Sequence, residues 1–211
     1  MQLRDAGVPV IDCDDNRLDE MCRDDAGNTG NHQGIVAIVA AANYSSIADI
    51  LAYAKKQGED ALIVLLDGIT DPHNMGAIIR SAEALGAHGV VITQRRSAGL
   101  NATVFRASSG AAAHMRIARE TNLVNTALAL KQQGIWICGA DAGEQTCGQA
   151  NLKGPLAICI GAEGEGISRL MKERCDFLVG IPLKGKTESL NASCAASILL
   201  YEIMRQRADA K

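Results

Sequence analysis

The chain has 211 residues, of which 47% are hydrophobic and 21% are charged, a balance typical of one ordinary folded domain plus a smaller segment. Only 3% of the residues are aromatic, so stacking of bases on aromatic platforms is excluded as a main mode of binding. The net charge of -3 is unevenly divided: residues 1–60 carry 5 basic and 11 acidic side chains, whereas residues 61–211 carry 16 and 13. The second part can therefore meet a polyanion through local basic patches, although it is not strongly basic.

The seven cysteines include no CxxC pair, and several lie in apolar runs, where a thiol behaves as a small hydrophobic group. We therefore expect free thiols in a reducing cytosol, with no disulfide framework and no metal site. No run of about 18 apolar residues is present to span a membrane. A basic and then apolar signal peptide is also missing, so we expect a cytoplasmic protein.

Three zones follow one another along the chain. Residues 1–42 are acidic and polar and end in a β-like run at 34–39, and residues 43–60 are expected to be helical or a linker. From residue 61 onward, strand and helix patterns alternate. The predicted strands are 61–66, 89–92, 135–138, 156–160 and 177–181, and the predicted helices are 74–85, 123–132, 167–173 and 190–207.

These strands read as continuous apolar runs separated by helices. Such a pattern predicts an α/β fold with a parallel sheet covered by helices on both faces. Ligands of such sheets bind at the carboxyl ends of the strands, so we look for the site in the loops after Leu66, Ile160 and Ile181.

A first motif runs from Asp67 to Arg80, at a strand end that leads into a helix. We expect Asn74 to cap this helix, because its side-chain oxygen can accept a hydrogen bond from a free backbone N–H. Arg80 lies in an otherwise apolar helical stretch. It is either a functional residue or a solvated arginine that is paired with Glu83 or Glu163.

A second motif, from Ile160 to Ile167, reads IGAEGEGI. Three glycines in six residues after a buried strand give a backbone that a ligand can approach closely, and the next helix start can bind an anion. A plain turn between a strand and a helix is the alternative interpretation.

A third motif runs from Ile181 to Ser193. Within it, residues 180–187 read GIPLKGKT, a formal match to the phosphate-binding P-loop. Two observations disfavour a P-loop NTPase. The helical pattern starts near Leu190 rather than at the lysine and threonine, and only 24 residues follow Thr187.

Together and in this order, the three motifs resemble the signature motifs of the SpoU/TrmH family of SPOUT RNA methyltransferases. The resemblance covers about residues 61–207. Further similarity to the subgroup of 23S rRNA guanosine-2′-O-methyltransferases lies in 71–74, 96–98, 100–103 and in the segment that starts at His32. The family implies a Rossmann-like domain whose C-terminal segment is tied in a trefoil knot, and a homodimer.

The resemblance also implies roles for individual residues. Transfer of a methyl group from S-adenosylmethionine to a ribose 2′-hydroxyl would use Arg80, helped by Asn74, Glu163, Ser189 and Asn191. The pKa of arginine is so high that the side chain stays protonated, which makes it a poor base. Positioning and charge stabilisation therefore describe the role of Arg80 better. For Ser189 and Asn191, capping of the last helix is the alternative. The residues implied to hold the methyl donor are Gly161, Gly166, Ile181, Leu183 and Leu190.

RNA contacts are expected from exposed basic residues, which bind phosphates without reading sequence. They are Arg96 and Arg106, and Lys184 and Lys186 beside the expected active site. Ordinary surface charge is the alternative for each. For the homodimer, the last helix with Ala195, Ile198, Leu199 and Ile203 is the expected interface, unless this helix packs only on the sheet.

The N-terminal zone is shorter than in relatives of this subgroup, which carry an L30e-like RNA-binding domain of about eighty residues. Residues 1–42 resemble the second half of that domain, residues 43–60 a linker and residues 61–211 the methyltransferase domain. We therefore expect a fragment or a late start, with a poorly packed first segment and weakened RNA affinity. A tRNA methyltransferase, a resistance-type rRNA methyltransferase, a P-loop NTPase and an inactive RNA-binding protein remain as alternatives.

Overall fold

A computed structural model describes residues 9–23, 27–37 and 43–209, except for the side chains of 142–144. The chain divides into two compact units, residues 1–40 and 41–211. In the described part of the first unit, helix α2 (Asp15–Met21) begins at the cap residue Asp14, whose side chain accepts from the Arg17 N–H at 2.9 Å. Leu18 is the one buried side chain among the residues described there. Residues 9–23 and 27–37 thus contribute little apolar core.

The β-like run predicted at 34–39 does not form a strand in its described residues. Residues 35–37 belong to no strand, and residues 38 and 39 lie outside the described part of the chain. The described residues of this unit offer the run no partner strand, and a strand needs neighbours for its backbone hydrogen bonds.

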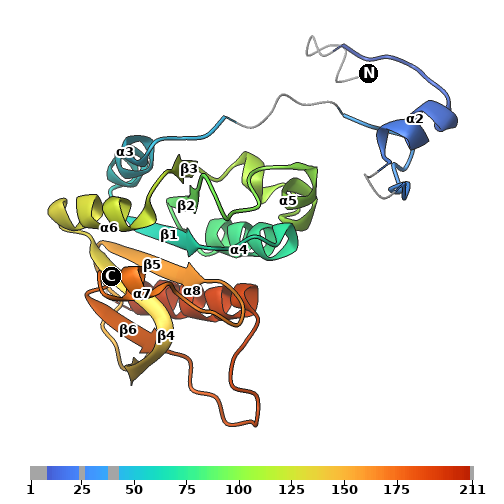
Figure 1. Cartoon of the computed structure of the whole chain (residues 1–211). Coiled ribbons are helices and arrows are strands. Elements are labelled where there is room, and N and C mark those ends of the chain that lie inside the picture. The colour runs from blue at the N-terminus through green and yellow to red at the C-terminus, as the bar shows by residue number, and fades with distance from the viewer. Residues whose placement is uncertain (1–8, 24–26, 38–42, 210–211) are drawn as a thin grey trace. The chain divides into compact units, whose positions relative to one another are not determined.

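The second unit is built on one six-stranded parallel sheet in its described residues (Figure 1). The strand order is β3-β2-β1-β5-β4-β6. The strands are β1 (Leu62–Asp67), β2 (Gly89–Thr93), β3 (Ile117–Glu120), β4 (Trp136–Thr146), β5 (Leu156–Gly161) and β6 (Phe177–Gly180). The expected parallel sheet is therefore confirmed.

Helices cover both faces of this sheet, as its apolar strands predict. The helices are α3 (Ile47–Gln57), α4 (Pro72–Ala84), α5 (Ala102–Ala107), α6 (Leu123–Gln132), α7 (Arg169–Lys172) and α8 (Ala192–Ala208), with a short 3-10 turn at Ala111–Ala113. In β1, Leu62 and Val64 pack in one core with α4, α5 and α8. Ile63 and Leu65 pack in a second core with α3, α6 and α7. Alternate side chains of one strand thus serve both layers.

Several elements differ from the sequence prediction. Strand β3 and helix α5 were not predicted, and β4 continues eight residues beyond Cys138, to Thr146. Only Ile117 and Ala118 of β3 are buried, so this short edge strand lacks a long apolar run. Residues 43–60 contain α3, which starts with a capping box of Ser46 and Asp49.

The last helix begins at Ala192 rather than at Leu190, because Asn191 is its cap. Two residues that we assigned to a dimer interface, Leu199 and Ile203, are buried in the core against the sheet. That part of the prediction is wrong, because the face of the helix that carries these residues packs against the sheet. Cys194, Ile198 and Tyr201 are exposed instead.

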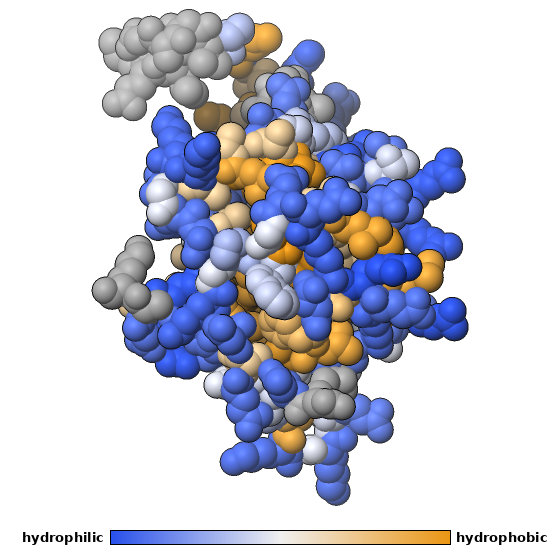
Figure 2. All heavy atoms as spheres, turned by 90° about the vertical axis from the view of Figure 1, so that its left-hand side faces the viewer, coloured by the Kyte–Doolittle hydropathy of each residue, from blue (hydrophilic) through white to orange (hydrophobic). Residues whose placement is uncertain are grey.

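No helix in the described residues is long and apolar enough to cross a membrane. On the side that carries α3 and α6, apolar residues lie in several small groups among hydrophilic ones (Figure 2). Scattered apolar residues of this kind are normal on the surface of folded domains.

Candidate active site

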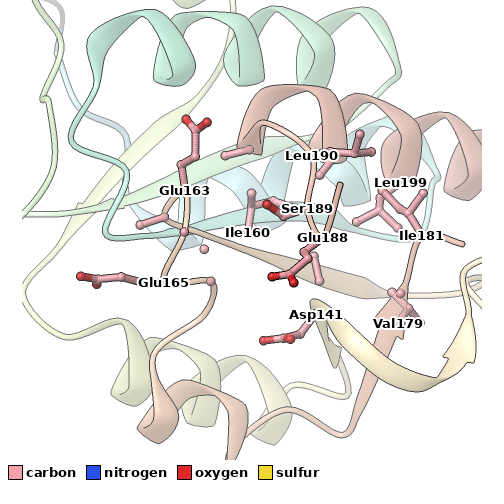
Figure 3. A pocket seen from close by; sticks show the side chains of 18 of the residues that line it. Asp141, Ile160, Glu163, Glu165, Val179, Ile181, Glu188, Ser189, Leu190 and Leu199 are labelled. Atoms are coloured by element: carbon pink, nitrogen blue, oxygen red, sulfur yellow. The ribbon is translucent and has the colours of Figure 1, made fainter. Parts of the chain in front are cut away.

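A cavity of about 300 Å³ lies at the ends of β5 and β6 and beside the middle of β4, where the pairing of β4 with β5 stops (Figure 3). The loop after β5, the segment after β6 and the first turns of α8 complete its walls. Five residues predicted to hold a donor line this one cavity: Gly161, Gly166, Ile181, Leu183 and Leu190. The position agrees with the rule that ligands of parallel sheets bind at the carboxyl ends of the strands.

The loop after β5 folds back tightly on the end of that strand. Ala162 pairs with Gly166, whose N–H donates to the Ala162 carbonyl at 2.8 Å. A Cβ atom on Gly161 would lie 2.0 Å from the carbonyl carbon of Gly166. A glycine is therefore required at 161 for close approach, whereas Gly166 needs its left-handed conformation, with φ of 69°.

A carboxylate at the end of β1 ties this loop to the neighbouring strand. Asp67 Oδ2 accepts from the Ser168 N–H at 2.8 Å. The backbone N–H of Ser168, the residue before α7, is therefore already hydrogen-bonded. Helix α7 covers Arg169–Lys172 and is shorter than the predicted 167–173.

Three motif residues from distant parts of the chain meet at the rim of the cavity. Asn191 Nδ2 donates to Asn74 Oδ1 at 2.9 Å and lies 3.3 Å from Glu163 Oε2. Asn74 Nδ2 donates to the same carboxylate oxygen at 3.4 Å. Asn74 follows β1 and Glu163 follows β5, the adjacent strands between which the strand order reverses. Loops diverge at such a point and leave a crevice for ligands.

The prediction that Asn74 caps its helix is wrong. The cap of α4 is Asp71, whose carboxylate accepts from the backbone N–H groups of His73 and Asn74 at 3.1 Å each. Pro72 follows at the first helical position, where its missing N–H costs nothing. Asn74 lies inside the first turn, and its amide is used for the contact with Glu163.

Asn191, by contrast, does cap α8. Its Oδ1 accepts from the N–H groups of Ser193 at 2.9 Å and Cys194 at 3.3 Å. The Nδ2 group of the same amide points to Asn74. Capping and a place in the site are thus combined in one side chain.

Two other predicted residues do not join this cluster. Arg80 is exposed on α4, and its guanidinium forms no ion pair with Glu83, Glu163 or any other residue that the structure describes. Ser189 lines the cavity from an exposed segment, and its hydroxyl makes no hydrogen bond to the described chain. The helical face of Arg80 is therefore open to solvent rather than apolar and covered.

The predicted RNA-binding residues are all exposed. Arg96 lies in the loop after β2 with a φ of 57°, and Arg106 lies on α5. Lys184 and Lys186 lie in the segment between β6 and α8, next to the cavity. In the described residues none of the four forms an ion pair, so their charges are available to a polyanion.

The prediction missed other cavity residues, above all Asp141, Lys172 and Glu188. Asp141 forms an ion pair with Lys172. Asp141 lies inside β4, where the pairing with β6 is interrupted after Ala140, and no local sequence signal marks that interruption. Lys172 lies on a helix that follows the cavity loop and carries no motif signal.

Buried thiols near the sheet are poor nucleophiles. Burial raises the pKa of Cys175 to about 11, and burial likewise raises the pKa of Cys159, which lies in β5. Both groups therefore stay protonated at neutral pH and are poor nucleophiles.

The formal P-loop match is not supported by the local structure. Residues 181–191 contain no helix, and α8 starts only at Ala192, so no helix N-terminus follows the lysine and threonine directly. A phosphate-binding loop needs that helix start to present its N–H groups.

Comparison with known proteins gives a consistent result. The model of the SpoU rRNA Methylase family matches residues 61–201. The 23S rRNA (guanosine-2′-O-)-methyltransferase RlmB of Vibrio parahaemolyticus is 48% identical over 193 residues, which cover 89% of this chain and 76% of that protein. An uncharacterized tRNA/rRNA methyltransferase of Synechocystis is 48% identical over 202 residues, 95% of this chain and 51% of that protein. The chain thus spans about half the length of this relative.

Among solved structures, the SpoU methyltransferase AviRb from Streptomyces viridochromogenes, in complex with the cofactor AdoMet, is 35% identical with a TM-score of 0.66. The match covers 71% of this chain and 62% of that one. An AdoMet-bound rRNA methyltransferase from Sinorhizobium meliloti is 26% identical with a TM-score of 0.63, over 69% and 56% of the two chains. The family model extends over the whole sheet, from β1 to α8, and the chain belongs to the SpoU rRNA methylase family.

Proposed function

We propose that this chain transfers the methyl group of S-adenosylmethionine to a ribose 2′-hydroxyl of RNA, and that the target is a guanosine of 23S rRNA. The observation that carries the proposal is the meeting of Asn74, Glu163 and Asn191, one from each motif, at the rim of the cavity. The similarity to RlmB supports the choice of 23S rRNA.

In the reaction, the 2′-oxygen attacks the methyl carbon while the carbon–sulfur bond breaks. The electron pair of that bond goes to sulfur and yields S-adenosylhomocysteine, and the hydroxyl proton leaves to solvent or to a substrate phosphate. The hydroxyl is a weak acid and must be polarised as it attacks. The exposed, unpaired guanidinium of Arg80 is suited to stabilise the developing alkoxide and to hold a neighbouring phosphate.

The other residues then orient the reactants. Asn74, Glu163 and Asn191 form a connected polar cluster whose geometry is held by two helix starts. The exposed hydroxyl of Ser189 lies on the cavity wall, within reach of the donor or the ribose. Gly161, Gly166, Ile181, Leu183 and Leu190 form the walls for the donor, mostly with backbone and apolar groups, which suit an adenine ring.

The RNA itself is proposed to lie over Arg96, Arg106, Lys184 and Lys186, which would contact phosphates. These contacts fix the position of the strand and do not read its bases. For that reason a tRNA target and a resistance-type rRNA target remain the alternatives within the same reaction.

Three finer features of the proposal come from the family resemblance. The segments of the second and third motifs, 160–167 and 181–193, are proposed to form the trefoil knot that the family resemblance implies. Residues 1–42 are proposed to be part of an L30e-like RNA-binding domain. The active enzyme is proposed to be a homodimer, with α8 at its interface.

The first test is calorimetric titration of the full chain with S-adenosylmethionine and, separately, with Mg-ATP. We expect one donor site per chain and no heat from ATP. Methyl transfer is then measured on unmodified 23S rRNA and on tRNA. An Arg80→Ala variant should bind the donor normally but lose methyl transfer by a factor on the order of a hundred or more, because a positioned cation is lost from the transition state.

The matched control is Arg169→Ala, which removes an exposed arginine whose ion pair in the described part of the chain is with Glu173, the residue after α7. This control should keep full activity. Binding of ATP without binding of the donor would overturn the methyltransferase assignment. Full activity of Arg80→Ala would overturn the role of Arg80 but not the proposed reaction. Methylation of tRNA but not of rRNA would show that the substrate is tRNA.

A further inference from the structure

One carboxylate in the donor cavity belongs to none of the three motifs. Asp141 lies at the point where β4 leaves its pairing with β6: Ala140 is opposite Val179, and the next paired residue of β4 is Gln145, opposite the same valine. Interruptions of this kind re-aim side chains at functional edges of sheets. Here the interruption places Asp141 on the wall of the cavity, between the ends of β5 and β6.

The Asp141 carboxylate is held by a cation from another element. Lys172 of α7 lines the same cavity, and its ammonium group binds Asp141 Oδ2. A carboxylate offers about four lone-pair positions and can therefore accept from several donors at once. Because lysine already balances the charge, this position suits neutral hydrogen-bond donors better than a second cation.

The rest of the cavity shows which part of a nucleoside would reach this carboxylate. Val179, Ile181, Leu190 and Leu199 gather on one side of the cavity, Glu165 lies on the opposite side, and Asp141 lies between them (Figure 3). A flat base on the apolar side would carry its sugar toward Asp141.

We propose that Asp141, positioned by Lys172, accepts hydrogen bonds from the 2′- and 3′-hydroxyl groups of the ribose of the methyl donor. A vicinal diol presents two neutral donors at a spacing that one carboxylate can accept, and acidic residues bind ribose hydroxyls in this way in other nucleotide-binding α/β sheets. The inference rests on the proposed donor binding and assigns a specificity residue to it.

The test is a comparison of affinities for ribose and deoxyribose ligands. Calorimetric titration of the full chain uses S-adenosylhomocysteine and its 2′-deoxy and 3′-deoxy counterparts. For the unmodified chain we expect at least about tenfold weaker binding when a hydroxyl is missing, because a hydrogen bond to a charged group is lost. In Asp141→Ala the three ligands should bind within about twofold of one another. Lys172→Arg should keep the discrimination, and Lys172→Met should reduce it.

Glu173→Gln is the matched control, because it removes a neighbouring carboxylate that lies outside the cavity and pairs with Arg169. It should discriminate like the unmodified chain. Equal binding of all three ligands by the unmodified chain would refute the role of Asp141 and leave the methyltransferase intact. Undiminished discrimination in Asp141→Ala would refute it as well. Failure of the unmodified chain to bind either S-adenosylmethionine or S-adenosylhomocysteine would instead refute the proposed function itself, and this inference with it.

Discussion

At the scale of single residues, the site depends on side chains that cap a helix and also contact other residues of the site. Asn191 shows this most clearly, because an amide carries both an acceptor and a donor. Its Oδ1 caps α8 through the N–H groups of Ser193 and Cys194. Its Nδ2 contacts Asn74 and Glu163. The start of the last helix and the rim of the cavity are thereby held by one group.

The two jobs can be separated by substitution. Asn191→Ser keeps a good cap but loses the amide donor, whereas Asn191→Ala loses both. We expect both variants to lose most methyl transfer. The free energy of unfolding should fall by about 1 kcal/mol in the alanine variant and stay nearly unchanged in the serine variant. Urea unfolding and a methyl-transfer assay decide this, and an active serine variant would limit Asn191 to capping.

At the scale of elements, α8 is tied to the sheet unit at both ends. Asn191 holds its start near the cavity, and Arg207 holds its last turn at the opposite, amino edge of the strands. The guanidinium of Arg207 donates to the carbonyl groups of Asp60, Ala61 and Gly154, which lie just before β1 and β5. The helix thus spans the sheet from one edge to the other, and its position at the cavity does not depend on Arg207 alone.

We expect Arg207→Met to destabilise the fold by about 2 kcal/mol, since buried carbonyl groups lose charge-assisted hydrogen bonds. Donor affinity should stay the same, because the cavity lies at the other edge of the sheet. The matched control is Arg205→Met, which removes only a surface arginine paired with Glu202 and Asp209. That variant should leave the free energy of unfolding nearly unchanged, because exposed ion pairs contribute little. A large loss of donor affinity in Arg207→Met would show that the whole helix shifts.

At the scale of the whole molecule, the outer side of α8 is the feature that bears on assembly. Cys194, Ile198 and Tyr201 follow one another at helical spacing and are all exposed, with 41% of Ile198 and 55% of Tyr201 accessible. Exposed apolar stripes of this kind mark contact surfaces. They support α8 as the interface of the proposed homodimer, with Ile198 in place of the buried Leu199 and Ile203.

If this surface forms the dimer, Ile198→Glu combined with Tyr201→Glu should convert it to a monomer, because two charges would be buried without partners. Light scattering coupled to size-exclusion chromatography measures the mass. Leu128→Glu, which changes an exposed leucine on α6, is the control and should stay dimeric. A monomeric unmodified chain would exclude the homodimer at the concentration tested, and a dimeric double variant would place the interface elsewhere.

Much of the fold could be predicted from local pattern. Buried strands such as β1 and β5 are short apolar runs, and helices such as α6 are bounded by their own caps and glycines. These signals depend on residues a few positions apart, so the sequence alone was sufficient for the parallel sheet, the two helical layers and the edge at which ligands bind. The three motifs, with their glycines and polar residues, likewise named most of the residues that line the cavity.

Contacts between distant residues could be decided only by the tertiary structure. The Asn74–Asn191 contact joins residues 117 positions apart, and the contact of Asn74 with Glu163 joins residues 89 positions apart. Strand β3 forms because it pairs with β2 at the edge of the sheet, whereas its own composition does not predict a strand. Asp141 enters the cavity only because β4 breaks its pairing with β6 at that residue. Sequence periodicity records which face of an element is buried, whereas the partner it meets depends on the packing of the whole sheet.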